Sequence, residues 1–123
     1  MKADSPTERL VNPALVDEIR ETMMSTKDAQ HLAGHFQLLA DPMRLRMVYA
    51  LSEVEELCVG DLAAVVGASE SGTSHQLRQL RLAGLVRTRK QGRVVYYRVA
   101  DAHVRTLLDV ASQHYLREPE GGS

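Results

Sequence analysis

The sequence contains a single cysteine, Cys58, and no run of apolar residues that approaches the length of a membrane-spanning helix. One cysteine excludes an internal disulfide framework and fits a reducing compartment. A spanning helix needs about 20 consecutive apolar residues, and the N-terminus also lacks the apolar core of a secretory signal peptide. With 123 residues, 44% of them hydrophobic and 25% charged, the chain is expected to be a soluble cytoplasmic protein with one domain and no membrane partner.

The sequence also lacks the arrangements that carry common enzyme chemistry. There is no Ser/His/Asp or Cys/His set for nucleophilic catalysis and no glycine-rich loop for phosphate. His31 and His35 have helical zinc-pair spacing, but the segment HLAGH lacks the glutamate of a metalloprotease HExxH motif. We therefore expect no enzymatic activity and no small organic substrate, and interpret both histidines as surface or packing residues.

Charge is unevenly distributed along a chain whose net charge is only -1. The first 70 residues hold most of the acids, whereas residues 71–100 contain no aspartate or glutamate at all. That window carries Arg78, Arg81, Arg87, Arg89, Lys90, Arg93 and Arg98. A basic block on a near-neutral chain indicates either a polyanionic partner, most often nucleic acid, or merely a solvated charged face.

Apolar periodicity and capping residues predict six helices and one β-hairpin. We expect the helices near residues 13–24, 28–39, 42–52, 59–66, 69–83 and 101–116, with a hairpin of alternating β-branched and aromatic residues around Gln91-Gly92. The inward positions are predicted to be Leu45, Val48 and Leu51 in the third helix, and Leu77, Leu80 and Leu82 in the fifth. The domain is expected over residues 13–118, between an arm at 1–12 and a tail at 119–123.

The fourth and fifth helices, joined by a turn at Gly67, form a helix-turn-helix pattern, and the basic hairpin that follows is a wing. Hydroxyl, amide and guanidinium groups on the fifth helix are suited to phosphates and base edges, whereas Ser69 is better explained as a helix cap. The predicted DNA-contacting residues are Ser71, Thr73, Ser74, His75, Gln76, Arg78, Lys90 and Arg93. The fold class is therefore mainly α with a small β-hairpin (α+β): a winged helix-turn-helix.

Four stretches, LADPMRLRMVYAL, ELCVGDLA, SESGTSHQLRQLRLAGLV and RKQGRVVYYRVAD, resemble the ArsR/SmtB family of metal-responsive repressors. The resemblance covers about residues 30–118. It implies a homodimer with a helical interface built by the first and last helices, which binds operator double-stranded DNA as apo-protein and releases it on binding an effector. Some relatives use a thiolate site, but Gly60 stands where the second thiolate would be, so Cys58 is interpreted as a buried structural residue.

The last helix carries the candidate metal ligands Asp101, His103 and His114. The two histidines are eleven positions apart, which places them within about 20° of one helix face but about 16 Å apart along its axis. A single zinc ion, with bonds of about 2.1 Å, cannot join them within one helix. If two copies of the helix pack antiparallel about a two-fold axis, each His103 meets the partner's His114, which predicts metal sites between subunits.

The family pattern continues with a fourth ligand three residues after the second histidine, where this chain has Arg117. We expect either Glu118, one residue later, or water to take that place. Zn(II) suits imidazole and carboxylate donors best, with Co(II) or Ni(II) as alternatives. The resemblance also implies that His114 hydrogen-bonds towards the fifth helix near His75, which would relay the bound state. Taken without the resemblance, two histidines on an apolar helix are more often packed at an interface than bound to a metal, and Asp101 could serve only as the N-cap of the helix.

The sequence therefore predicts a metal-released transcriptional repressor. The alternative within the same family is a repressor with a non-metal effector or with none, which Arg117 favours. A metal-buffering or hydrolytic protein belongs to a different class, in which the basic wing would have no purpose.

Overall fold

The computed structural model describes residues 9–116, which divide between two units, residues 1–33 and 34–123. The first unit contains α1 (Pro13–Thr22) and the start of α2 (Thr26–Leu39). Asn12 caps α1 by accepting a hydrogen bond of 3.1 Å from the Leu15 amide, and Pro13 occupies the first helical turn, where its missing N–H costs nothing. No residue of α1 is buried.

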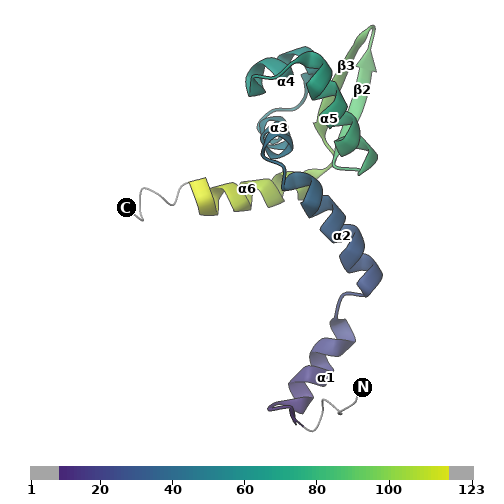
Figure 1. Ribbon diagram of the computed structural model, residues 1–123, viewed down its shortest axis with the longest axis vertical. Helices are drawn as coiled ribbons and strands as arrows, with labels where there is room; N and C mark the ends of the chain where they lie inside the picture. The colour runs from purple at the N-terminus through teal and green to yellow at the C-terminus, as the bar shows by residue number, and fades with distance from the viewer. Residues whose placement is uncertain (1–8, 117–123) are drawn as a thin grey trace. The chain divides into compact units, whose positions relative to one another are not determined.

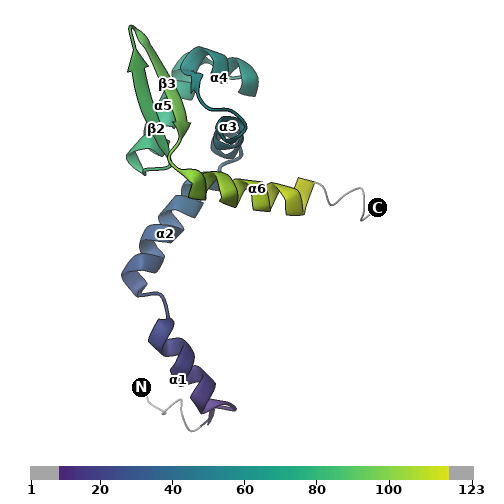
Figure 2. The same cartoon turned by 180° about the vertical axis from the view of Figure 1, so that it is seen from behind.

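The second unit contains the end of α2 followed by α3 (Pro42–Ser52), β1 (Leu57–Cys58), α4 (Val59–Val66), α5 (Glu70–Leu82), β2 (Val86–Gln91), β3 (Val94–Val99) and α6 (Ala102–Leu116). Figures 1 and 2 show the β2–β3 hairpin beside α3, α4 and α5. The strands form an antiparallel sheet in the order β1-β3-β2. The predicted fold class, helices plus a small hairpin in winged helix-turn-helix order, is confirmed.

The core lies where α3, α4, α5 and the base of the hairpin meet. Its fully buried side chains include Met47, Val48, Leu51, Leu62, Leu77, Leu80 and Val86. At about 25 cal/mol for each Å² of apolar surface removed from water, this cluster supplies the main stabilisation of the unit. The helix-turn-helix is therefore held together by apolar packing, which leaves its polar face available.

Three side-chain expectations need correction. Leu45 is 41% exposed and Leu82 is 78% exposed, although both were expected to face inward. Thr73 is 0% exposed, although it was expected on the outer face of α5. The reason is helical phase: Thr73, Leu77 and Leu80 are spaced by four and three residues and share one stripe, whereas Leu82 lies about 200° from Leu80.

Two further features differ from the predicted elements. Leu57 and Cys58 pair with Tyr97 and Tyr96, so the wing has a third, two-residue strand that the sequence pattern does not predict. In addition, α1 ends at Thr22 rather than near residue 24, and α2 starts at Thr26 rather than near residue 28. Ser25 Oγ, just before α2, accepts a hydrogen bond of 3.0 Å from the Asp28 amide.

Three arginines bind backbone carbonyls at or just beyond the C-terminal ends of helices. Arg44 donates to the Leu38 carbonyl of α2 at 3.3 Å, and Arg46 donates to the Val66 carbonyl of α4 at 3.1 Å. Arg105 of α6 donates to the carbonyl of Ser52, the last residue of α3. The last carbonyls of a helix have no partner within it and carry partial negative charge, so each guanidinium both satisfies an acceptor and fixes one helix to another. None of the described helices is long and apolar enough to cross a membrane.

Candidate DNA-binding surface and metal-binding helix

The fifth helix presents a polar stripe to solvent. Ser69 caps it by accepting a hydrogen bond of 3.0 Å from the Gly72 amide, as expected of a capping residue. A Cβ added at Gly72 would lie 3.0 Å from Ser69 Oγ, so the glycine leaves room for this cap. Beyond the cap, Ser71, His75 and Arg78 are exposed at helical spacing. The stripe can therefore donate several hydrogen bonds along one line of the helix.

One predicted DNA-contacting residue, Thr73, is buried, and another, Gln76, is half-buried with its carbonyl oxygen shielded from solvent. The buried Thr73 hydroxyl has no hydrogen-bond partner within residues 9–116, and neither has the buried Oε1 of Gln76. Ser74 and Gln76 are half-buried at the edge of the polar stripe. Thr73 therefore leaves the set of DNA-contacting residues, because its side chain has no access to solvent.

The wing divides the basic block into two groups. Lys90 and Arg93 are exposed beside the turn, where Gly92 takes a φ of 65°, a left-handed conformation that favours glycine. Arg89, by contrast, donates from Nε to both carboxylate oxygens of Glu56 at 3.1 Å and lies 4.7 Å from the centroid of the Tyr96 ring.

These contacts change the charge that DNA would meet. The hydrogen bond from Arg89 lowers the pKa of Glu56 below its ordinary value of 4.5, and the same bond raises the pKa of Arg89. Arg98 lies 3.8 Å from Glu55 in an exposed ion pair. The acids before β1 thus partner two of the arginines of the wing, and the cations left facing solvent are concentrated on α5, along β2 and at the hairpin tip.

The sixth helix carries the predicted metal ligands at its two ends. Asp101 Oδ1 accepts hydrogen bonds from the amides of His103 at 2.9 Å and Val104 at 3.1 Å, so this carboxylate caps the helix. His103 Nδ1 lies 3.7 Å from the same oxygen, and the imidazole is 99% exposed. His114 is also exposed and contacts the Tyr115 ring edge-on, with 4.6 Å between centroids.

Because α6 is continuous from Ala102 to Leu116, His103 and His114 stand about 16 Å apart along its axis. Within the described range, no three metal-ligating side chains of one chain gather around a common point. The structure brings together Asp101 and His103 but not His114, and Glu118 lies outside the described residues. The donors nevertheless fit a divalent transition metal as two half-sites, since imidazole nitrogen and carboxylate oxygen are its ordinary ligands and both imidazoles are open to solvent.

The remaining candidates are placed as follows. Cys58 is a half-buried free thiol at the N-cap of α4. His31 is exposed and His35 half-buried, both on α2. Between residues 9 and 116, no hydrogen bond joins the side chains of His114 and His75, so the relay between them stays a prediction.

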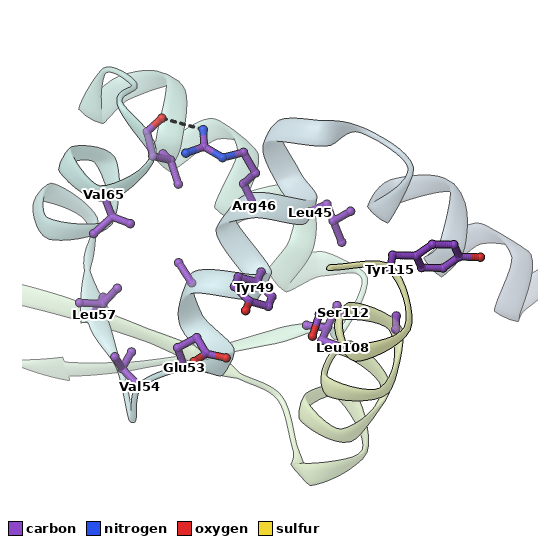
Figure 3. A pocket seen from close by; sticks show the side chains of 13 residues that line it. Leu45, Arg46, Tyr49, Glu53, Val54, Leu57, Val65, Leu108, Ser112 and Tyr115 are labelled. Atoms are coloured by element: carbon purple, nitrogen blue, oxygen red, sulfur yellow. Dashed lines mark hydrogen bonds between the residues drawn. The ribbon is translucent and has the colours of Figure 1, made fainter. Parts of the chain in front are cut away.

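An apolar pocket of about 770 Å³ opens between α3, α4 and α6. Figure 3 shows Leu45 and Tyr49 of α3 facing Leu108 and Ser112 of α6, with Val65 on the far side. Tyr115 also lines this pocket, and α6 exposes Leu107 and Val110 elsewhere on its surface. Contiguous apolar side chains of this kind mark binding surfaces, either for a second protein chain or for an apolar molecule.

Comparison with known proteins agrees with this arrangement. A family model described as bacterial regulatory protein, arsR family, matches residues 41–88, which include α3, α4 and α5. The chain is 48% identical over 105 residues to the transcriptional repressor SmtB homolog of Synechocystis sp., covering 85% of this chain and 79% of that one. It is 34% identical over 90 residues to the cadmium resistance transcriptional regulatory protein CadC of Listeria innocua, covering 73% of this chain and 76% of that one.

The structural match extends over nearly the whole chain. The homodimeric winged helix-turn-helix DNA-binding domain Mb0332 of Mycobacterium bovis superimposes with a TM-score of 0.62 and 27% identity, covering 93% of each chain. The family model, which ends at residue 88, therefore covers the helix-turn-helix, and the structural match extends over the wing as well.

Proposed function

Since the chain belongs to the ArsR/SmtB family of transcriptional repressors, we propose that it is a homodimer that binds operator DNA as apo-protein and releases it when a divalent transition metal binds between the subunits. The chain is a DNA-binding regulator rather than an enzyme. The observation that supports the proposal is the placement of Asp101 and His103 at the start of α6 and of His114 near its end, on a chain that also presents the recognition helix and wing.

DNA binding is assigned to two surfaces. Ser71, His75 and Arg78 on α5 face the major groove, with Ser74 and Gln76 at the edge of the stripe. Lys90 and Arg93 at the tip of the wing contact the phosphate backbone next to it. The exposure of Ser71, His75, Arg78, Lys90 and Arg93 supports this division.

The metal ligands are assigned across the dimer. Asp101 and His103 of one protomer, together with the partner's His114, would hold the ion, and Glu118 or water would complete the set. Zn(II) is the proposed metal, with Co(II) or Ni(II) as alternatives; a bound ion supplies a rigid connection between the two copies of α6. The exposed Leu107, Val110 and Tyr115 support α6 as an interface helix.

One observed contact and one expected hydrogen bond would connect this site to the rest of the protomer. Arg105, one turn into α6, donates to the Ser52 carbonyl of α3, so a change in the position of α6 would be passed to α3, which packs against α4 and α5. The second expected connection is a hydrogen bond from His114 towards α5 near His75. A metal changes operator affinity only if it binds the two dimer geometries unequally, and these contacts are where that difference would act.

The test is DNA binding by fluorescence anisotropy at fixed salt, with the duplex taken from upstream of the protein's own gene. Apo-protein should bind tightly, and one of Zn(II), Co(II), Ni(II) or Cd(II), added singly, should weaken binding at least about tenfold, which is about 1.4 kcal/mol of coupling. His103→Ala and His114→Ala should each abolish the metal response, whereas His31→Ala, a matched control on α2, should retain it. A wild-type protein that releases no DNA with any of these metals would refute the metal-sensing part of the proposal.

Glu118 is tested separately. Glu118→Gln should weaken zinc affinity if the carboxylate is a ligand; unchanged affinity would assign the fourth position to water.

A second candidate function is a repressor of the same family whose effector is not a metal. The pocket between α3, α4 and α6 favours it, because a volume of about 770 Å³ with an apolar lining lies within the range of small-molecule sites. Tight DNA binding that is indifferent to every metal, together with a thermal shift on adding apolar compounds, would support this candidate over the first.

A further inference from the structure

A single arginine joins three helices of the DNA-binding unit. Arg44 of α3 directs both Nε and Nη2 at one atom, Oε1 of Gln79 on α5, at 3.1 and 2.8 Å. Its third nitrogen, Nη1, donates to the Leu38 carbonyl at the end of α2 at 3.3 Å. Its backbone amide is held in turn by Asp41 Oδ2 at 3.0 Å. The end of α2, the start of α3 and the middle of α5 therefore meet at one guanidinium.

The geometry of this contact is specific. A guanidinium carries only donors, so the atom of Gln79 that faces two of its N–H groups has to be the carbonyl oxygen, and the amide orientation is settled. The planar guanidinium of Arg44 fixes the direction of the Gln79 side-chain amide, which the flexible ammonium group of a lysine cannot do. Arg44 and Gln79 are both half-buried, so water competes only partly for these hydrogen bonds.

Gln79 occupies a critical position on α5. It lies one turn after His75 and next to Arg78, on the flank between the exposed stripe and the buried residues Leu77 and Leu80. Apolar packing through these leucines sets how close α5 lies to the core, but it is non-directional and resists sliding or rotation only weakly. DNA-contacting side chains have to be held within about 0.5 Å of their productive positions, and a directional bond on the flank of the helix supplies that constraint.

We infer that Arg44 and Gln79 are positioning residues that fix the recognition helix against the end of α2, and that operator affinity depends on this link. The inference rests on the proposed DNA-binding function. It makes Arg44 important for DNA binding although its side chain is turned into the protein and contacts α2 and α5.

The experiment measures operator affinity of apo-protein by fluorescence anisotropy over a series of salt concentrations, for Arg44→Met, Arg44→Lys and Gln79→Leu. Each variant should bind about tenfold more weakly than wild type, with the wild-type salt dependence retained, because no phosphate contact is lost. The double variant Arg44→Met/Gln79→Leu should bind no more weakly than either single variant, since both remove the same bond. Circular dichroism and sedimentation establish that the variants remain folded with the wild-type oligomeric state.

Arg46→Met is the matched control, because it removes the same charge from the same helix but breaks a bond to α4 rather than α5. It should bind within about threefold of wild type. Gln79→Leu keeps the test decisive if Arg44→Met fails to fold, since it removes only the acceptor. Failure of the wild type to bind the duplex would overturn the proposed function and leave the link without a role.

Three results would overturn the inference while DNA binding itself stands. The first is wild-type affinity in Gln79→Leu. The second is full affinity in Arg44→Lys with loss in Arg44→Met, which would make charge rather than geometry the cause. The third is a fall of about 1.8 in the magnitude of the slope of log K against log salt in Arg44→Met, about 0.9 for each protomer of the proposed dimer, which would make Arg44 a direct phosphate ligand.

Discussion

Replacing Leu80 by alanine tests whether the recognition helix is held by its buried stripe. Leu80 is 0% exposed and belongs to the core cluster that also contains Leu77 and Val86. Truncating a fully buried leucine costs about 2–5 kcal/mol, from lost transfer energy and from the cavity that remains. For a domain of about 100 residues, each kcal/mol lowers the melting temperature by about 4–8 °C, so we expect a fall of at least about 8 °C.

The matched control is Leu82→Ala on the same helix, where the side chain is 78% exposed. Removing an exposed side chain should change the free energy of unfolding by no more than about 0.5 kcal/mol. Both variants are compared with wild type by guanidinium denaturation of apo-protein at one fixed concentration, because the stability of a dimer depends on concentration. Equal destabilisation by the two substitutions would refute the assignment of the inner face of α5, whatever the size of the effect.

Three other sites give further tests. Gly67→Ala should destabilise by about 1 kcal/mol in thermal melts, because residue 67 ends α4 with a φ of 72°; an unchanged midpoint would contradict this. Arg93→Ala should weaken operator binding and reduce the magnitude of the salt slope by about 1.8, about 0.9 for each protomer of the proposed dimer, and an unchanged slope would remove Arg93 from the phosphate contacts. Glu56→Gln should be less stable than wild type at neutral pH, because bonding to Arg89 lowers the pKa of Glu56 in the folded protein; this difference should be complete above about pH 4.5 and shrink as the pH falls through the lowered pKa, and a difference in melting temperature that does not shrink on acidification would contradict it.

The elements of this fold follow closely from local sequence signals. Asp41-Pro42 starts α3 and Gly67 ends α4, as expected of a capping aspartate, a proline in the first turn and a left-handed glycine. By contrast, β1 has only two residues, which is too short for any alternation, and it exists because β3 offers an edge to pair with. Its partner is chosen by tertiary structure, so the sequence around Leu57 and Cys58 carries no local sign of a strand.

The inner face of α5 was harder to assign, because composition and helical phase disagree there. Leu82 is apolar and suggests burial, while Thr73 is polar and suggests exposure. Phase is decisive, since Thr73 shares a stripe with Leu77 and Leu80 and is carried into the core although its hydroxyl finds no partner in the described chain. Arg44 illustrates a different difficulty: its partner Gln79 lies 35 positions away, and nothing local distinguishes it from the exposed Arg46.

The basic block shows why charge counted along the chain overstates the charge presented to DNA. The window 71–100 contains no acid, yet the fold brings Glu55 and Glu56 back against the wing, where they meet Arg98 and Arg89. Arg89 already has a carboxylate partner in Glu56, so taking a phosphate instead would gain it little and would leave the carboxylate facing DNA. The counterions released on binding, and therefore the salt dependence of operator affinity, should thus come from α5 and the hairpin tip rather than from every arginine of the block.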